Sequence, residues 1–289
     1  MPPITPTEKL TVGGVPVFIK RDDLYTAPTP LGATPPEGAP PPPFAKPRGL
    51  VPYLSKLKDD GITQVAYMDT SISMSGWAVA YYATMLGLKP YIIFPGYKDG
   101  PRHNMAKHIE LCTRLGAIVL HLDKPAQSSV NYYRARNMME ADYGRVAMLP
   151  QGLPFDETVV SMALAINSIP KPALGGTIVI AVGSGTMAAG VVSGLIHHKI
   201  DQTVVGVAVS PKDMQRLYRT IMVKAHGLLK GAWCRKHLSV ADKGWEYLAT
   251  PDITAPFPCN PNYDLKAWAW LVDNVQSLTR PILFWNIGA

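Results

Sequence analysis

The chain has 289 residues, of which 47% are hydrophobic and 17% are charged. This length and composition are typical of a globular protein with one or two domains, and no apolar run approaches the roughly 20 residues of a membrane span. The first residues have neither a basic start nor an apolar run, so no signal peptide is expected. Three cysteines lie far apart without metal-ligand spacing, which is typical of free thiols in the cytoplasm and predicts no metal site.

The net charge of +7 comes almost entirely from one segment. Residues 212–237 contain seven Lys and Arg side chains against a single Asp. Such a basic segment can contact nucleic acid or another polyanion, and it can equally be the solvated surface of a helix and a loop. Charge alone does not decide between these two interpretations.

The N-terminal part combines a short strand with a proline-rich stretch. Residues 15–19 predict a strand that runs into a charged turn. Residues 28–52 then contain ten prolines, four of them consecutive at 40–43, so the stretch is irregular or polyproline-like. It is either a linker or a fixed loop beside a site.

From residue 54 onward the pattern alternates between helix and strand, which indicates an α/β protein with a mainly parallel sheet. Helices are expected at 50–60, 76–86, 104–115, 130–143, 158–167, 190–198, 217–229 and 264–278. Strands are expected at 64–67, 91–94, 117–122, 146–149, 177–182, 203–209 and 281–285.

A glycine loop follows the apolar strand at 177–182 and contains Gly183, Ser184, Gly185 and Thr186. A loop of this kind presents unpaired backbone N–H groups at the positive end of a helix, and such groups bind phosphate. It also fits a dinucleotide-binding turn, with Asp201 at the distance of a ribose contact, and a purely structural turn. The loop by itself does not identify the phosphate.

Four further segments, at 19–24, 44–50, 70–76 and 260–267, resemble motifs of the fold-type-II pyridoxal-phosphate enzymes. They read IKRDDL, FAKPRGL, TSISMSG and NPNYDLKA, and the glycine loop lies in the expected place between the third and the fourth. The similarity is greatest to the branch of aminocyclopropane-carboxylate deaminase and D-cysteine desulfhydrase, and it covers most of the chain. No motif is decisive alone, but all five occur in the right order.

The resemblance implies two open-sheet α/β subdomains with pyridoxal 5'-phosphate in the cleft between them. The larger, cofactor-binding subdomain is expected at 1–49 plus 151–289, and the smaller one at 50–150. The glycine loop, residues 183–186, would then hold the cofactor phosphate.

The resemblance also implies roles for single residues in the two motifs nearest the cofactor. Lys46 would form the Schiff base, Tyr263 would stack near the ring or donate a proton, and Asp264 would pair with the pyridine nitrogen. An aspartate there keeps the nitrogen protonated and makes the ring a strong electron sink. Without the resemblance, Lys46 would be interpreted as a surface lysine, Tyr263 as a half-buried tyrosine, and Asp264 as a helix N-cap.

Substrate contacts are expected from the serine turn and from Gln151. Ser73 would act in catalysis beside the substrate carboxylate, with Ser71 and Ser75 close by. A serine-rich turn that begins a helix would look the same without any ligand. Two positions depart from the family pattern: Met74 replaces an asparagine that contacts the cofactor ring, and Pro47 favours an extended backbone at the preceding lysine.

The function expected from these features is that of a pyridoxal-phosphate-dependent lyase. The enzyme would form an aldimine with an amino-acid-type substrate and stabilise an α-carbanion, in decarboxylation or in deamination or elimination. Asp264 and the basic segment suggest an amino acid attached to a nucleotide or DNA base. The alternatives are a non-catalytic binding protein of the same fold and a dinucleotide-dependent oxidoreductase. A cytoplasmic homodimer is expected, with nucleic acid as a further partner of residues 212–237.

Overall fold

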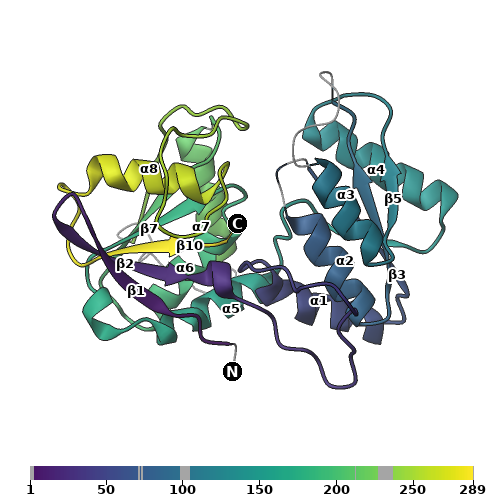
Figure 1. Cartoon of the computed structure of the whole chain (residues 1–289), viewed down its shortest axis with the longest axis horizontal. Coiled ribbons are helices and arrows are strands. Elements are labelled where there is room, and N and C mark those ends of the chain that lie inside the picture. The colour runs from purple at the N-terminus through teal and green to yellow at the C-terminus, as the bar shows by residue number, and fades with distance from the viewer. Residues whose placement is uncertain are drawn as a thin grey trace. The chain divides into compact units, whose positions relative to one another are not determined.

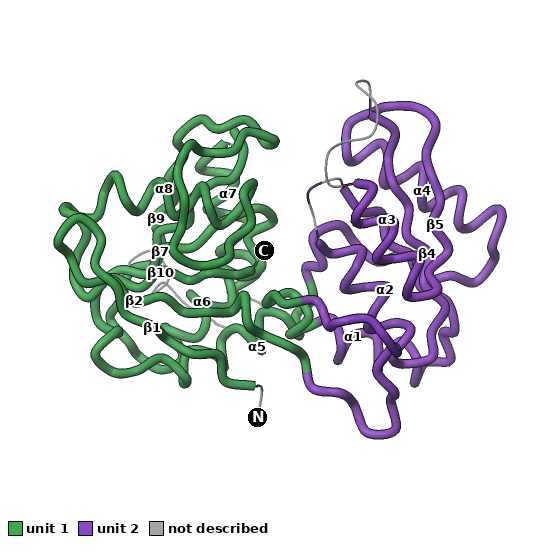
Figure 2. Tube along the Cα trace, viewed as in Figure 1, with its two compact units in different colours: residues 1–27, 43–49, 155–289 green, residues 28–42, 50–154 purple. Residues whose placement is uncertain are grey.

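The computed structural model describes residues 3–70, 72, 74–97, 105–211, 213–226 and 237–288. They form two compact units, which Figure 2 colours separately. Unit 1 comprises Met1–Ala27, Pro43–Gly49 and Phe155–Ala289, and unit 2 comprises Pro28–Pro42 and Leu50–Pro154. Relative to the ranges expected from the sequence, unit 2 also takes in residues 28–42 and 151–154, because both segments pack mainly with unit 2.

Unit 1 is built on a six-stranded sheet with the order β1-β2-β10-β7-β8-β9 (Figure 1). Its strands are β1 (Thr7–Val12), β2 (Val15–Arg21), β7 (Thr177–Val182), β8 (Thr203–Ala208), β9 (Leu238–Ala241) and β10 (Ile282–Asn286). The first pair is antiparallel, and the other described pairs are parallel. Because β10 lies between β2 and β7, segments from both ends of the chain meet beside the glycine loop.

Helices cover both faces of this sheet. One face carries α5 (Asp156–Ala165), α6 (Thr186–His197) and α7 (Met214–His226), and the other carries α8 (Asp264–Asn274). Successive side chains of β7 alternate between the two apolar clusters, as the pleat of a strand requires. Every residue of β7 is buried, which is typical of a central parallel strand.

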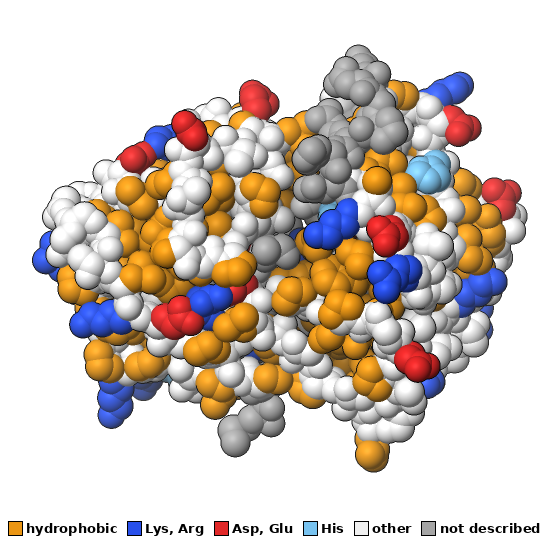
Figure 3. Space-filling model, viewed as in Figure 1, with side chains coloured by type: hydrophobic (Ala, Val, Ile, Leu, Met, Phe, Trp, Pro, Cys, Tyr) orange, Lys and Arg blue, Asp and Glu red, His pale blue; other side chains and the backbone are white. Residues whose placement is uncertain are grey.

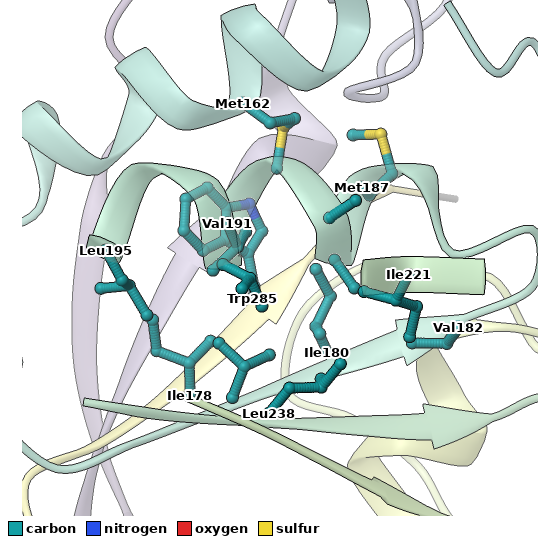
Figure 4. Packing of buried hydrophobic residues seen from close by; sticks show 14 of the residues in the cluster. Met162, Ile178, Ile180, Val182, Met187, Val191, Leu195, Ile221, Leu238 and Trp285 are labelled. Carbon is teal, nitrogen blue, oxygen red and sulfur yellow. The ribbon is translucent and has the colours of Figure 1, made fainter. Parts of the chain in front are cut away.

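The apolar cluster under α6 fixes the helix that follows the glycine loop (Figure 4). Figure 4 shows Ile221 of α7 beside Val182 of β7, with Met162 of α5 on the side of α6 that faces away from the sheet. Two glycines of α6 let α5 lie directly against its backbone. A Cβ at Gly190 would come 2.4 Å from the Cβ of Met162, so no larger residue fits there without a shift.

Unit 2 contains a four-stranded, all-parallel sheet with the order β5-β4-β3-β6. Its strands are β3 (Gln64–Met68), β4 (Lys89–Phe94), β5 (Ile118–His121) and β6 (Ala147–Met148). Its helices are α1 (Pro47–Asp59), which starts in unit 1, α2 (Ser75–Met85), α3 (Met105–Arg114) and α4 (Ser128–Asp142). Among the helices of the described chain, none combines the length and the apolar character needed to cross a bilayer.

The expected alternation of helices and strands is confirmed, with shifts at element ends. Helix α1 begins at Pro47 rather than at residue 50, because proline is favoured at the first position of a helix. Helix α6 begins at Thr186 rather than at residue 190, directly after Gly185 in a left-handed conformation. Strands β1 and β9 were not predicted, since both are short edge strands with polar residues among the apolar ones. Residues 104 and 227–229 of two expected helices lie outside the described residues.

Replacing Gly190 tests the close packing of α5 on α6. The substitution Gly190→Ala places a methyl group against Met162, and overpacking of this kind costs about 1–3 kcal/mol, more than the roughly 1 kcal/mol gained in helix propensity. We therefore expect Gly190→Ala to have a lower free energy of unfolding than the unmodified protein, as measured by urea unfolding. His197→Ala, at an exposed position of the same helix, is the control and should leave stability nearly unchanged. Equal stability of both variants would contradict the packing described here.

Candidate functional site

Lys46 lies in a short turn that is held against the residues that follow β10. The backbone N–H of Ala45 donates to the carbonyl of Ile287 at 2.8 Å, and Phe44 forms an isolated bridge with Gly288. Gly288 has φ +128°, and a Cβ there would lie 2.4 Å from the Cβ of Phe44. Only glycine permits this approach, so the backbone itself determines where the lysine turn lies.

A buried carboxylate, Asp22, anchors the far end of the same turn. Arg48 donates to it at 2.9 and 3.3 Å, and the indole of Trp285 donates at 2.9 Å. The hydroxyl of Thr5 donates a fourth hydrogen bond. The side chains of Arg48 and Asp22 are 1% and 0% exposed, and the guanidinium lies 3.9 Å from the centroid of the Tyr25 ring. Four donors compensate the buried charge, which fixes the turn between strands β2 and β10.

The glycine loop adopts the geometry of an anion-binding turn. Gly185 has φ +82° and precedes α6, and a Cβ there would lie 2.8 Å from Ile221 of α7. A Cβ at Gly183 would lie 3.3 Å from the ring of Tyr263. Within α6, all of whose residues are described, no side chain caps the first turn and no acidic residue lies in it. The loop therefore directs the positive end of the helix toward the space beside this ring.

Tyr263 connects the glycine loop to the lysine turn. Its ring lies beside Gly183, and the Nζ atom of Lys46 is 5.7 Å from the ring centroid. Its hydroxyl shares a hydrogen bond of 2.6 Å with the hydroxyl of Tyr247. Either oxygen can donate in this pair, so a proton at the Tyr263 hydroxyl has a defined partner.

A buried lysine holds the loop that carries Tyr247. Lys266 of α8 donates to the carbonyls of Val209, Glu246 and Tyr247 at 2.7, 2.8 and 3.0 Å. Burial lowers the pKa of this lysine to about 8. Its three N–H donors match three carbonyls, so the ammonium ties the end of β8 and the tyrosine loop to α8.

Asp264, the first residue of α8, is a carboxyl group enclosed by protein. It is 1% exposed, and its Oδ1 accepts the N–H of Ile287 at 2.9 Å. Its pKa is raised to about 7, chiefly by burial and also by the charge of Asp23, while the N–H of Ile287 and the charge of Lys46 act in the opposite direction. A cationic group bound beside Asp264 would favour its ionised form.

The structure brings the predicted residues of unit 1 into one group. Lys46, residues 183–186, and the consecutive residues Tyr263 and Asp264 come from three separate segments and surround the C-terminal ends of β7 and β10. This edge of a parallel sheet is where open α/β folds bind ligands.

The serine turn lies in unit 2, and Ser71 and Ser73 are outside the described residues. Ser75 is the first residue of α2 and is buried. The following N–H, of Gly76, donates to the buried carboxylate of Asp69 at 3.0 Å, which fixes the start of the helix.

Gln151, also in unit 2, accepts a hydrogen bond of 2.9 Å from the hydroxyl of Ser128, the first residue of α4. The contact lies at an exposed position. A substrate role for Gln151 and for the serines remains a prediction.

Much of the basic segment, residue 212 and residues 227–236, lies outside the described residues. On the face drawn in Figure 3, Lys and Arg side chains of the described chain are interspersed with Asp and Glu.

Sequence reasoning did not assign a role to four residues of the site: Asp22, Lys224, Tyr247 and Lys266. Lys224 of α7 donates to the carbonyl of Ser184 at 2.6 Å and to the hydroxyl of Thr186 at 3.0 Å. In the sequence it is one of seven cations in a basic segment, and Tyr247 lies in a loop with no periodicity. Only the charged motif at 19–24 drew attention to the neighbourhood of Asp22.

The chain matches the model of one protein family, "PALP: Pyridoxal-phosphate dependent enzyme", over residues 45–245. A similar curated protein is the "Glycyl-dTMP PLP-dependent decarboxylase" of Pseudomonas phage M6, which is 34% identical over 98% of both chains. Among solved structures, an ACC deaminase homologue aligns with a TM-score of 0.75 and 23% identity over 99% of this chain and 90% of its own. Threonine deaminase isoform 2 from Solanum lycopersicum aligns with a TM-score of 0.65 and 15% identity, over 99% of this chain and 83% of its own.

The chain therefore belongs to the family of pyridoxal-phosphate-dependent enzymes. The expected fold type, cofactor and enzyme class, a pyridoxal-phosphate-dependent lyase, are confirmed. The dinucleotide interpretation of the glycine loop is not supported, because the family uses a different phosphate-bearing cofactor.

The donor set of unit 1 fits pyridoxal phosphate in chemistry. A phosphate suits the backbone N–H groups at the start of α6, where no acidic residue lies in the first turn. A pyridine nitrogen suits the buried carboxyl of Asp264. An aldehyde suits the amine of Lys46, whose Nζ atom lies 5.7 Å from the centroid of the Tyr263 ring.

Replacing Lys266 tests its role in holding the tyrosine loop. Lys266→Met leaves three carbonyls without their donor, and we expect a loss of about 2–3 kcal/mol in the free energy of unfolding. Lys243→Met, which removes an exposed ion pair with Asp273, is the control and should cost less than about 1 kcal/mol. Urea unfolding measures both. Equal losses would contradict the anchoring role.

Asp264 predicts how the stability of the cofactor-free protein depends on pH. Its pKa is 3.8 when unfolded and about 7 when folded, so between these values the folded state binds more protons and stability falls as pH rises. Asp264→Asn removes this contribution. Relative to the unmodified protein, the variant should gain stability from pH 4 to pH 7, by a few kcal/mol at about 1.4 kcal/mol per pKa unit.

Urea unfolding at a series of pH values measures the effect. Asp273→Asn, at an exposed position, is the control and should leave the pH profile unchanged. A profile for Asp264→Asn that runs parallel to that of the unmodified protein would contradict the raised pKa.

Proposed function

We propose that this protein decarboxylates an amino acid that is attached to a nucleotide. The observation that carries the proposal is the similarity over the full chain to a protein named a glycyl-dTMP decarboxylase. The buried carboxyl of Asp264 near Lys46 supports it, because loss of carbon dioxide from an α-carbon requires a strong electron sink.

Four elements of unit 1 would hold the cofactor. Lys46 would bind its aldehyde, the loop 183–186 its phosphate, Asp264 its ring nitrogen, and Tyr263 would lie beside its ring. When bound, pyridoxal phosphate supplies a ring that accepts the electron pair released at the substrate's α-carbon. Asp264 would stay ionised in that state and keep the ring nitrogen protonated.

The remaining work of the chain is to orient the substrate and to handle one proton. Decarboxylation breaks the bond between the α-carbon and the carboxylate, and a proton must then be added at the α-carbon. The Nζ atom of Lys46 and the hydroxyl of Tyr263 are the candidate donors, with Tyr247 as the hydrogen-bond partner that orients the hydroxyl. The serines at 71, 73 and 75 and Gln151 would bind the substrate.

The assembly and the location of the protein belong to the same proposal. A cytoplasmic location agrees with the free thiols of Cys112 and Cys259, and a homodimer agrees with the resemblance to enzymes that commonly form dimers. The basic segment at 212–237 would favour a substrate that carries phosphate. Nucleic acid is the alternative partner of that segment, and binding to duplex DNA that falls steeply with salt would support it.

The first experiment tests Lys46. Borohydride should fix the cofactor to the purified protein, and peptide mass spectrometry should place the label on Lys46. Lys46→Arg should abolish labelling and turnover, whereas Lys58→Arg in α1, on a lysine that donates to a backbone carbonyl, should retain both. A colourless protein that binds no added cofactor would instead support a non-catalytic binding protein.

The second experiment identifies the reaction. With a glycine-substituted thymidine nucleotide, carbon dioxide should be released in amounts equal to the substrate consumed, without ammonia. Free glycine, D-cysteine and aminocyclopropane carboxylate should turn over at least tenfold more slowly. Ammonia release, or equal turnover of the free amino acids, would contradict the proposal.

A further inference from the structure

Helix α7 packs directly against the glycine loop, and its Lys224 contacts that loop. The space that a Cβ at Gly185 would need is filled by Ile221 of α7, at 2.8 Å. Lys224 lies three residues further on, on the same face of the helix. Its Nζ atom donates to the carbonyl of Ser184 at 2.6 Å and to the hydroxyl of Thr186 at 3.0 Å. The two contacts fix an ammonium group at the loop.

This position is electrostatically unusual for a cation. The start of a helix carries a partial positive charge and favours anions, and natural sequences place Asp or Glu there. Within the fully described first turn of α6 there is no acidic residue, and a lysine from another helix approaches instead. An anion bound beside both positive groups is stabilised by each of them. The arrangement is therefore suited to a dianion.

The contact with Lys224 also orients the hydroxyl of Thr186. An ammonium can only donate, so the oxygen of Thr186 accepts from it and must direct its own hydrogen elsewhere. The hydroxyl of Ser184 lies 3.2 Å from that oxygen, on the same loop. Thr186 is 2% exposed, so few orientations are open to it. The lysine thus converts the threonine hydroxyl into a donor toward the loop and its ligand.

We propose that Lys224 is a ligand of the cofactor's phosphate group and sets the enzyme's preference for the phosphorylated cofactor. The proposal rests on the phosphate role of residues 183–186 stated under the proposed function. A phosphate monoester could also come from a nucleotide substrate, and the experiment below separates the two sources. The cofactor is favoured because Lys224 contacts the same loop that begins α6 and borders Tyr263.

The test compares two cofactor forms that differ only in the phosphate. Dissociation constants of pyridoxal phosphate and of pyridoxal are measured by absorbance for the unmodified protein and for Lys224→Gln, without substrate. We expect the constant for pyridoxal phosphate to rise about 10- to 100-fold, as for a lost hydrogen bond to a charged group, and that for pyridoxal to stay within twofold. Lys224→Arg keeps the charge and should restore most of the affinity.

Phosphorus NMR provides a second readout that does not depend on activity. The signal of the bound cofactor should stay at the dianion position as pH falls toward 6 in the unmodified protein, and should titrate in Lys224→Gln. Arg219→Gln removes the same charge from an exposed position of α7 and should change neither measurement. Thermal unfolding of each variant checks that it is folded.

Four outcomes would overturn the inference. If Lys224→Gln weakens both cofactor forms equally, the lysine only supports the loop. If Lys224→Gln leaves the dissociation constant of the cofactor unchanged but raises KM for a nucleotide substrate more than for the nucleoside, Lys224 binds the phosphate of the substrate. If Gly185→Val weakens binding of pyridoxal phosphate and Lys224→Gln does not, the loop holds the phosphate without the lysine. If neither variant has an effect, the phosphate role of the loop fails as well.

Discussion

The buried carboxylate of Asp22 is the interaction on which the rest of unit 1 depends. Its four donors come from the N-terminal segment, the lysine turn and β10, which are far apart in the sequence. A carboxylate taken out of water is unfavourable unless such partners are in place, so these segments are stable only together. The same contacts determine where the backbone of the lysine turn runs. The position of Lys46 therefore depends on this buried carboxylate as well as on the backbone contacts of the turn with Ile287 and Gly288.

The groups of the site in unit 1 form a gradient of charge across a short distance. The start of α6 and Lys224 are positive, while Asp264 is a carboxyl group whose pKa is raised by burial, which disfavours its ionised form. The ring of Tyr263 lies beside Gly183, and the Nζ atom of Lys46 is 5.7 Å from its centroid. A ligand with an anion at one end and a basic nitrogen at the other matches this order.

Much of this arrangement could be predicted from the sequence. The strand at 177–182 is apolar throughout and is followed by two glycines, and both signals depend only on local conformation. Lys46, Tyr263 and Asp264 came from motif order, which places segments on one sheet edge without giving distances. Tyr247 and Lys224 could not be found this way. Their positions depend on the packing of α7 and of an irregular loop, and no residue pattern encodes either. The strands β1 and β9 were missed because edge strands mix polar and apolar residues.

The place of β10 in the sheet has a consequence for how the protein is made. Strand β2, near residue 20, has no parallel partner until residues 282–286 have been synthesised. Contacts between such distant parts of a chain form slowly, because a long loop must close before they stabilise anything. While the ribosome is still translating, β2 and β7 thus expose unpaired edges, and Asp22 lacks the indole of Trp285. The lysine turn likewise lacks its backbone contacts with Ile287 and Gly288 until those residues have been synthesised.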